Sequence, residues 1–148
     1  MARLINILVV DDEEGIRNLL FDVLSNEGFK VTLAKDGMDS LNHMRKRRFD
    51  LLIADVNMPR LDGIGLLKKM KKAGRKEKVI LMTGNPVNKV FLNEDTQPVI
   101  TLLEKPFRIH HILNVISSAL TKQNRRRDGK TLIEMRNKST QAYPCSLN

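Results

Sequence analysis

The sequence predicts an α/β fold, a doubly wound parallel sheet of five strands with helices on both faces. Short, continuous apolar runs alternate along the chain with segments of helical period. Strands that are covered by helices on both sides read as uninterrupted apolar runs of this kind. Alternating strands and helices form parallel sheets, whose right-handed crossovers distribute the helices over both faces.

The first half of the chain supplies the first strands and helices of this fold. Apolar runs at residues 4–10 and 29–34 predict two strands. Between them a helical period predicts an amphipathic helix that Gly28 ends, with an apolar face of Ile16, Leu19, Leu20, Val23 and Leu24. Asp36 and Gly37 form a turn that caps a second helix, whose apolar face holds Met38, Leu41 and Met44.

The second half continues the alternation. The third strand, 51–54, ends at Asp55, and Asp62 opens a third helix with Ile64, Leu67 and Met70 on one face. A lysine-rich stretch leads to a fourth strand at residues 79–83. Residues 85–98 predict only a short or irregular helix, which Pro98 ends. A fifth strand from residue 99 precedes a clear last helix with Ile109, Ile112, Leu113, Ile116 and Leu120 on its apolar face.

Composition fits one globular, cytoplasmic domain. The chain has 148 residues, of which 41% are hydrophobic and 29% are charged, enough for a sizeable core. No run of eighteen apolar residues predicts a membrane helix, and the first apolar run leads directly into acidic residues rather than into a signal-peptide cleavage site. The lone Cys145 can form no internal disulfide, which fits a reducing compartment.

Charge divides the chain into two parts. Residues 1–121 hold 19 Lys/Arg and 15 Asp/Glu, whereas residues 122–148 hold 7 and 2. We therefore expect a folded domain at 1–121 and a basic, flexible tail at 122–148. Its Arg125–Arg127 run favours a solvated tail over a nucleic-acid contact, although it can attract phosphates or an acidic partner. The tail is too short for a DNA-binding domain with its own core.

Polar side chains with reactive groups follow the predicted strands. Asp11 and Asp12 follow the first strand, Asp55 the third, Thr83 the fourth and Lys105 the fifth. Ligands bind at the carboxyl ends of the strands in such sheets. Three carboxylates gathered there repel one another unless a cation lies among them. An aspartate at a strand end is often a cap or turn residue, as we expect for Asp36 and Asp62, but the joint set favours a functional site.

The motifs at these positions resemble those of the receiver domains of response regulators, of which CheY is the single-domain example. They are Asp11-Asp12, the run from Asp55 to Gly63, Thr83-Gly84 and Lys105-Pro106-Phe107. The likeness covers roughly residues 3–121. It implies a flavodoxin-like (CheY-like) sheet in a three-layer α/β/α arrangement.

The resemblance also implies a role for each site residue. Asp55 is the expected phosphoacceptor. Mg²⁺ or another divalent cation is expected between Asp12 and Asp55, with Asp11 contacting it through water and Asn57 through its backbone carbonyl. Thr83 and Lys105 are expected to contact the phosphoryl oxygens, with a cis peptide bond between Lys105 and Pro106 directing the lysine inward. No other cofactor is expected.

The implied function is that of a response regulator receiver in two-component or phosphorelay signalling. It would take a phosphoryl group from the phosphohistidine of a histidine kinase or phosphotransfer protein, change its affinity for a downstream partner, and slowly hydrolyse the product. The reaction is self-catalysed, so the protein is not an enzyme in the usual sense. A monomer or a phosphorylation-dependent dimer is compatible with the sequence.

Two departures from the family pattern leave an alternative open. Leu102 stands where the family places a switching aromatic residue, and Pro98-Val99 replaces a common Gly-Ala. The alternative is a receiver-like interaction module that works without phosphorylation. An aspartyl-phosphate hydrolase is disfavoured, because that class needs an acid/base aspartate two residues after the nucleophile, where this chain has Asn57.

Overall fold

The computed structural model describes residues 3–84 and 99–124, and the chain divides into two compact units, Met1–Lys105 and Pro106–Asn148. The predicted helix within 85–98 and most of the predicted tail lie outside the described residues. In the first unit the strands are β1 (Asn6–Val10), β2 (Lys30–Ala34), β3 (Leu51–Asp55), β4 (Lys78–Thr83) and β5 (Val99–Glu104). Its helices are α1 (Glu14–Asn26), α2 (Gly37–Lys46) and α3 (Gly63–Lys72).

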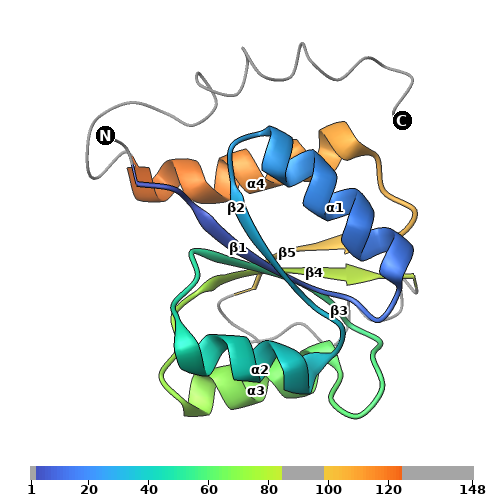
Figure 1. The fold of residues 1–148 in the computed structure, drawn as a ribbon, viewed down its shortest axis with the longest axis vertical. Coiled ribbons are helices and arrows are strands. Elements are labelled where there is room, and N and C mark those ends of the chain that lie inside the picture. The colour runs from blue at the N-terminus through green and yellow to red at the C-terminus, as the bar shows by residue number, and fades with distance from the viewer. Residues whose placement is uncertain (1–2, 85–98, 125–148) are drawn as a thin grey trace. The chain divides into compact units, whose positions relative to one another are not determined.

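The sheet of the first unit confirms the predicted doubly wound fold. All its strand pairs are parallel, and the strand order is β2-β1-β3-β4-β5. Helix α1 covers one face, and α2 and α3 cover the other (Figure 1). The chain runs outward from β1 to β2 and then crosses back to β3, so the winding reverses between β1 and β3. Doubly wound sheets bind their ligands at this reversal point.

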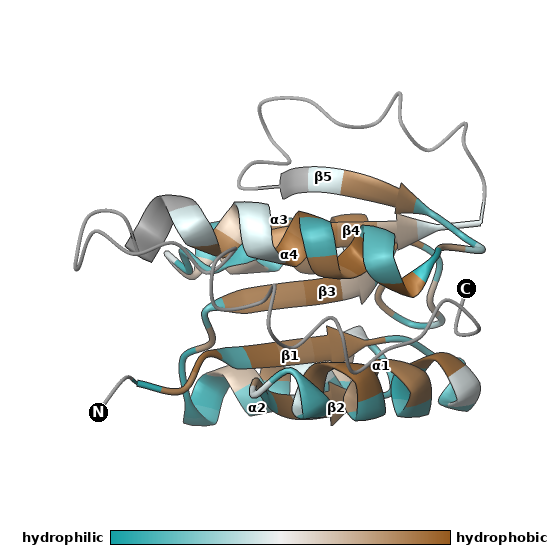
Figure 2. Cartoon of the chain, turned by 90° about the horizontal axis from the view of Figure 1, so that it is seen from above, coloured by the Kyte–Doolittle hydropathy of each residue, from teal (hydrophilic) through white to brown (hydrophobic). Residues whose placement is uncertain are grey.

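The apolar runs form the core as predicted, with corrections at their ends. Strands β1 and β3 are hydrophobic over most of their length (Figure 2), and their side chains from Ile7 to Val10 and Leu51 to Ala54 are buried. Leu4, which we placed in the first strand, precedes it and is 59% exposed. Leu19 and Met38, predicted to face the core, are exposed, because each lies at the margin of its helix's apolar face.

Capping interactions mark the end of α1 and the beginnings of α2 and α3, where the sequence predicts them. Gly28, at φ +91°, follows α1, and its N–H donates to the carbonyl of Ser25 while Phe29 N–H donates to that of Leu24. This pair of bonds is a Schellman motif, which favours a left-handed glycine. At the N-terminus of α2, the Asp36 side chain accepts from the N–H of Asp39, and Asp62 caps the N-terminus of α3 in the same way. Both caps confirm the predictions.

A buried ion pair fastens the C-terminal end of α2 to the start of β4, and the sequence did not reveal it. Arg75 pairs with Glu77, whose side chain is only 3% exposed. The guanidinium also donates to the backbone carbonyls of Met44 and Arg47, at 2.8 and 3.0 Å. Glu77 accepts a further bond from Phe49 N–H at 3.2 Å. Each charge is thus matched, and the last carbonyls of α2 gain a donor.

In the second unit the structure describes residues 106–124, which contain helix α4 (Ile109–Asn124). The helix begins at the first residue of the predicted apolar repeat, and the last predicted helix is therefore confirmed. Within the described ranges 3–84 and 99–124, none of the helices combines the length and the apolar character that crossing a membrane requires.

Candidate functional site

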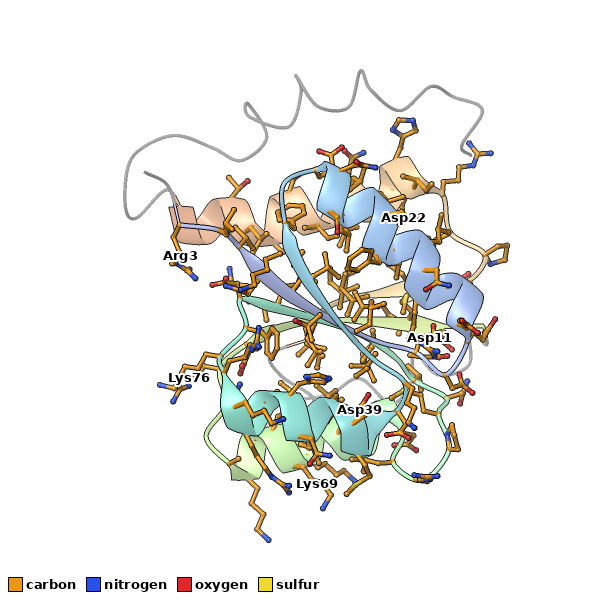
Figure 3. The ribbon with its side chains drawn as sticks, viewed as in Figure 1. Arg3, Asp11, Asp22, Asp39, Lys69 and Lys76 are labelled. Carbon is orange, nitrogen blue, oxygen red and sulfur yellow. The ribbon has the colours of Figure 1, made fainter. Side chains whose placement is uncertain are left out.

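Four side chains that the sequence singled out lie at the carboxyl ends of the strands. Asp55 and Thr83 are the last residues of β3 and β4, while Asp11 and Lys105 directly follow β1 and β5. Figure 3 shows Asp11 at the end of β1 from which the chain turns into α1. Because β1 and β3 are neighbours, this edge is also the point at which the winding of the sheet reverses.

Lys105 draws two buried carboxylates together. Its Nζ donates to Asp11 Oδ2 at 2.8 Å and to Asp55 Oδ2 at 3.0 Å. A third carboxylate, Glu13 Oε1, lies 3.3 Å from the same nitrogen. Asp11 is fully buried, whereas the Asp55 side chain is 7% exposed and so is in part open to solvent.

The loop between β1 and α1 is held on both sides of Asp11. The N–H of Asp11 donates to the carbonyl of Ala34 at the end of β2. Its carbonyl accepts from Arg17 of α1 at 2.7 Å. Its side chain accepts from the N–H of Glu13 at 2.9 Å through Oδ1, which leaves Oδ2 for Lys105. Asp11 is therefore oriented by backbone and side-chain bonds before any ligand binds.

The loop between β3 and α3 is fixed by close backbone packing behind Asp55. A Cβ added to Gly63 would lie 2.6 Å from the carbonyl oxygen of Asp55, so only glycine fits there. The N–H of Gly63 donates to the carbonyl of Val56. The backbone N–H of Asn57 donates to Asp55 Oδ1 at 3.1 Å, while Asp55 Oδ2 accepts from Lys105. Both oxygens of Asp55 thus have fixed positions.

The electrostatics of the site leave negative charge in excess. Burial raises the pKa of Asp11, although the Lys105 ammonium and the N–H of Glu13 act in the opposite direction. Burial by itself lowers the pKa of Lys105, but its hydrogen bonds to Asp11 and Asp55 outweigh this effect and raise that pKa above its usual value. The lysine is therefore charged, and one ammonium faces two buried carboxylates and the nearby Glu13.

The residues present fit a hard divalent cation. One carboxylate oxygen from each of Asp11, Asp12, Glu13 and Asp55 can be chosen so that all lie within 4.8 Å of one another. An all-oxygen, carboxylate-rich set is the donor chemistry that Mg²⁺ prefers. Asp12 is exposed, and the N-cap of α1 is Glu13 rather than Asp12, so the Asp12 carboxylate is accessible as a ligand. The excess negative charge gives such a cation an electrostatic reason to bind.

The structure brings most of the predicted site residues together. Asp11, Asp12, Asp55 and Lys105 form one cluster. Thr83 is buried beside it, and its carbonyl accepts from the N–H of Lys105 at 2.7 Å. The phosphoryl contact of the Thr83 hydroxyl and the metal contact of the Asn57 carbonyl stay predictions.

One acidic residue of the cluster was not predicted to take part. Glu13 reaches Lys105 and supplies a fourth carboxylate. Its signal in the sequence is its place directly after Asp11 and Asp12, in the run Asp11–Glu14. Leu102, the departure from the family pattern, is half-buried and packs against the core cluster on the side of α2 and α3.

Comparison with known proteins agrees with this geometry. Residues 7–117 match the family model of the response regulator receiver domain. The chain is 35% identical over 114 residues to sporulation initiation phosphotransferase F of Bacillus subtilis, an alignment that covers 77% of this chain and 92% of that protein.

Solved structures give the same result. A CheY-like receiver domain protein from Methanospirillum hungatei has a TM-score of 0.76 at 28% identity, covering 84% of this chain and 99% of that one. The response regulator TrrA of Thermotoga maritima, solved in complex with Mg²⁺ and BeF, has a TM-score of 0.71 at 27% identity, with 79% and 100% covered.

Proposed function

Since this chain belongs to the response regulator receiver family and is thus a receiver of two-component or phosphorelay signalling, we propose that Asp55 is its phosphoacceptor. The observation that carries the proposal is the position of the Lys105 ammonium, 2.8 Å from Asp11 and 3.0 Å from Asp55. It sets a cation beside Asp55, the aspartate of the two whose side chain is partly exposed. A phosphoryl group bound to Asp55 would meet that cation immediately.

The proposed reaction is a displacement at phosphorus. One Asp55 oxygen forms a bond to phosphorus while the bond from phosphorus to the imidazole nitrogen of a phosphohistidine breaks. The imidazole leaves with the bonding electron pair and takes a proton from water. Later, water attacks the same phosphorus, which releases inorganic phosphate and restores the carboxylate. Such transfers depend on positioning and charge neutralisation more than on covalent help from the protein.

The surrounding residues supply that positioning and part of the neutralisation. Asn57 N–H and Lys105 hold the two oxygens of Asp55, which limits the directions from which phosphorus can approach. Lys105 and the Thr83 hydroxyl would then contact the transferred oxygens. A divalent cation held by Asp11, Asp12, Asp55, the backbone carbonyl of Asn57 and, in addition, Glu13 would offset the negative charge that remains on carboxylates and phosphate.

The proposal includes partners and boundaries. A histidine kinase or phosphotransfer protein would donate the phosphoryl group, and a protein partner would respond to it. The receiver would comprise residues 1–121, followed by a basic tail. Leu102 replaces the expected switching aromatic, so the response must reach the partner without a swinging ring at that position.

The test is an intact-mass measurement. The protein is incubated with Mg²⁺ and a small acyl phosphate, and we expect the mass of one phosphoryl group to be gained by wild type and not by Asp55→Asn. Asp50→Asn is the matched control, because it makes the same chemical change at the start of β3, where Asp50 pairs with Arg3. It should keep the gain. Wild-type protein that gains no mass would support the interaction module that works without phosphorylation.

A further inference from the structure

An open groove lies between α2 and α3, in the part of each helix away from the acidic cluster. Its volume is about 460 Å³, within the range of about 300–1,000 Å³ that ligand-binding pockets have. Apolar side chains form part of its lining, namely Leu41, Met44, Met70 and Ala73. Cationic side chains form the rest, namely Arg45, Arg48, Lys69, Lys72 and Arg75. Within the part of the chain that the structure describes, no acidic side chain lines the groove.

This end of the first unit carries an exceptional charge. Residues 45–48 and 68–78 hold eleven Lys/Arg and one carboxylate. Their net charge of +10 (eleven minus one) exceeds the net charge of +9 of the whole chain. The single carboxylate, Glu77, is buried and already paired with Arg75. Figure 3 shows Lys69 and Lys76 well away from Asp11. The unit is therefore polarised, with acidic groups at the phosphoacceptor edge and cations at the groove.

The cations of the groove differ in their engagement. Arg75 donates to Glu77 and to the backbone carbonyls at the end of α2, and these bonds hold its side chain in place in the wall of the groove. Arg45, Arg48, Lys69 and Lys72 are exposed, and in residues 3–84 and 99–124 none of the four forms an ion pair. Cations near helix C-termini complement the helix dipole. The dipole alone, however, accounts neither for the apolar floor nor for Arg48, beyond the end of α2.

We propose that this groove, which we name the α2/α3 groove, binds an acidic amphipathic segment of a partner protein. The apolar side of the segment would lie on Leu41, Met44, Met70 and Ala73. Its carboxylates would pair with Arg45, Arg48, Lys69 and Lys72. Methionine side chains are flexible and polarisable, so the floor can adapt to a helix inserted between cations. The site goes beyond phosphoryl transfer and does not depend on it.

The lining favours a peptide over a nucleic acid. Proteins that bind single strands stack bases on aromatic side chains along a charged groove, but among the described residues 3–84 and 99–124 no aromatic side chain lines this groove. An apolar floor between two cationic rims instead matches the cross-section of a helix that has one apolar face and acidic flanks. Charge complementarity and apolar contact then act on the same ligand.

The experiment measures binding of a defined probe to the whole protein in EDTA, without a phosphodonor. The probe is a fluorescein-labelled peptide of about four helical turns, with leucines on one face and glutamates on the other. A scrambled peptide of the same composition tests the need for an apolar face. The variant Arg45→Glu/Lys69→Glu reverses two cations of the lining. Its matched control, Lys46→Glu/Lys68→Glu, makes the same charge change at neighbouring exposed positions outside the lining.

We expect the amphipathic peptide to bind more tightly than the scrambled one. The lining variant should weaken binding about tenfold or more, because two desolvated charge pairs become repulsive, and the control should weaken it less than about twofold. Equal losses of peptide affinity in both variants would overturn the proposal, because binding would then depend on the overall positive charge and not on the groove. It would also be overturned by tighter binding of an oligonucleotide or an anionic vesicle, or by self-association that only the lining variant removes. Because Asp55 takes no part, failure here leaves the phosphoacceptor proposal intact.

Discussion

Two ion-pair networks of the first unit differ in their charge balance. At the carboxyl edge of the sheet, Lys105 is shared by Asp11 and Asp55, with Glu13 nearby. At the other end, Glu77 is the only carboxylate with which Arg75 pairs in the described residues, and the guanidinium also donates to two backbone carbonyls. The first network has more carboxylates than cations, whereas the second is neutral, and Arg75 donates four hydrogen bonds within it.

The difference in charge balance distinguishes a functional site from a structural ion pair. A buried carboxylate without a full partner costs free energy, so a network with excess carboxylates persists where a cation or phosphoryl chemistry uses them. A matched network needs no ligand and serves to hold chain segments together. We therefore expect changes in the first network to alter chemistry and changes in the second to alter stability.

Lys105→Met tests the first network and should have the largest effect. It removes the ammonium that faces the transferred oxygens, so phosphorylation by a small acyl phosphate should slow by about 100-fold or more, the loss typical of one stabilising donor. Mg²⁺ affinity, measured by calorimetry, should rise because the ammonium no longer competes for Asp11 and Asp55. Lys35→Met is the control, since Lys35 directly follows β2 and is exposed. Unchanged rates in Lys105→Met would remove Lys105 from the proposed chemistry.

Arg75→Met tests the second network. Glu77 would lose its cation inside the fold, and the free energy of unfolding in urea should fall by about 3 kcal/mol. Changing both residues to methionine should recover much of the loss, because neither charge is then buried alone. Lys76→Met, at an exposed neighbouring position, should change stability little. If folded Arg75→Met lost the ability to accept a phosphoryl group, the network would not be purely structural.

Asp12→Ala should have the smallest effect on stability. The N-cap of α1 is Glu13 rather than Asp12, and removal of the Asp12 carboxylate relieves repulsion within the acidic cluster. We therefore expect weaker Mg²⁺ binding together with a slightly higher urea midpoint in EDTA. Asp62→Ala provides the contrast, because it removes the cap bond to Gly65 N–H and should cost about 1 kcal/mol. A sharp loss of stability in Asp12→Ala would reassign Asp12 to a structural role.

The sequence predicted the sheet and the acidic site because both depend on local patterns. Apolar runs of strand length fix where the chain is extended, and parallel pairing then brings Asp11, Asp55 and Lys105 to one edge. The caps Asp36 and Asp62 followed from the same kind of local chemistry. Such features need no knowledge of which segments meet in space.

What the sequence did not reveal depends on distant packing. The Arg75 guanidinium reaches the carbonyl of Met44, 31 residues away, and the lysine-rich stretch around it gave no sign of that contact. The α2/α3 groove likewise exists only once two helices lie side by side. Exposure of Leu19 and Met38 depends on how far each helix's covered face extends, which periodicity alone cannot define.

The ion pair between Lys105 and Asp11 joins residues that are 94 positions apart. Closing a chain segment of that length carries an entropic penalty. The last strand must join the sheet before the ammonium can reach its carboxylates. A chain that is still being synthesised and has not yet exposed β5 would have the aspartates but not the assembled centre. Competence to receive a signal is thereby linked to completion of the fold.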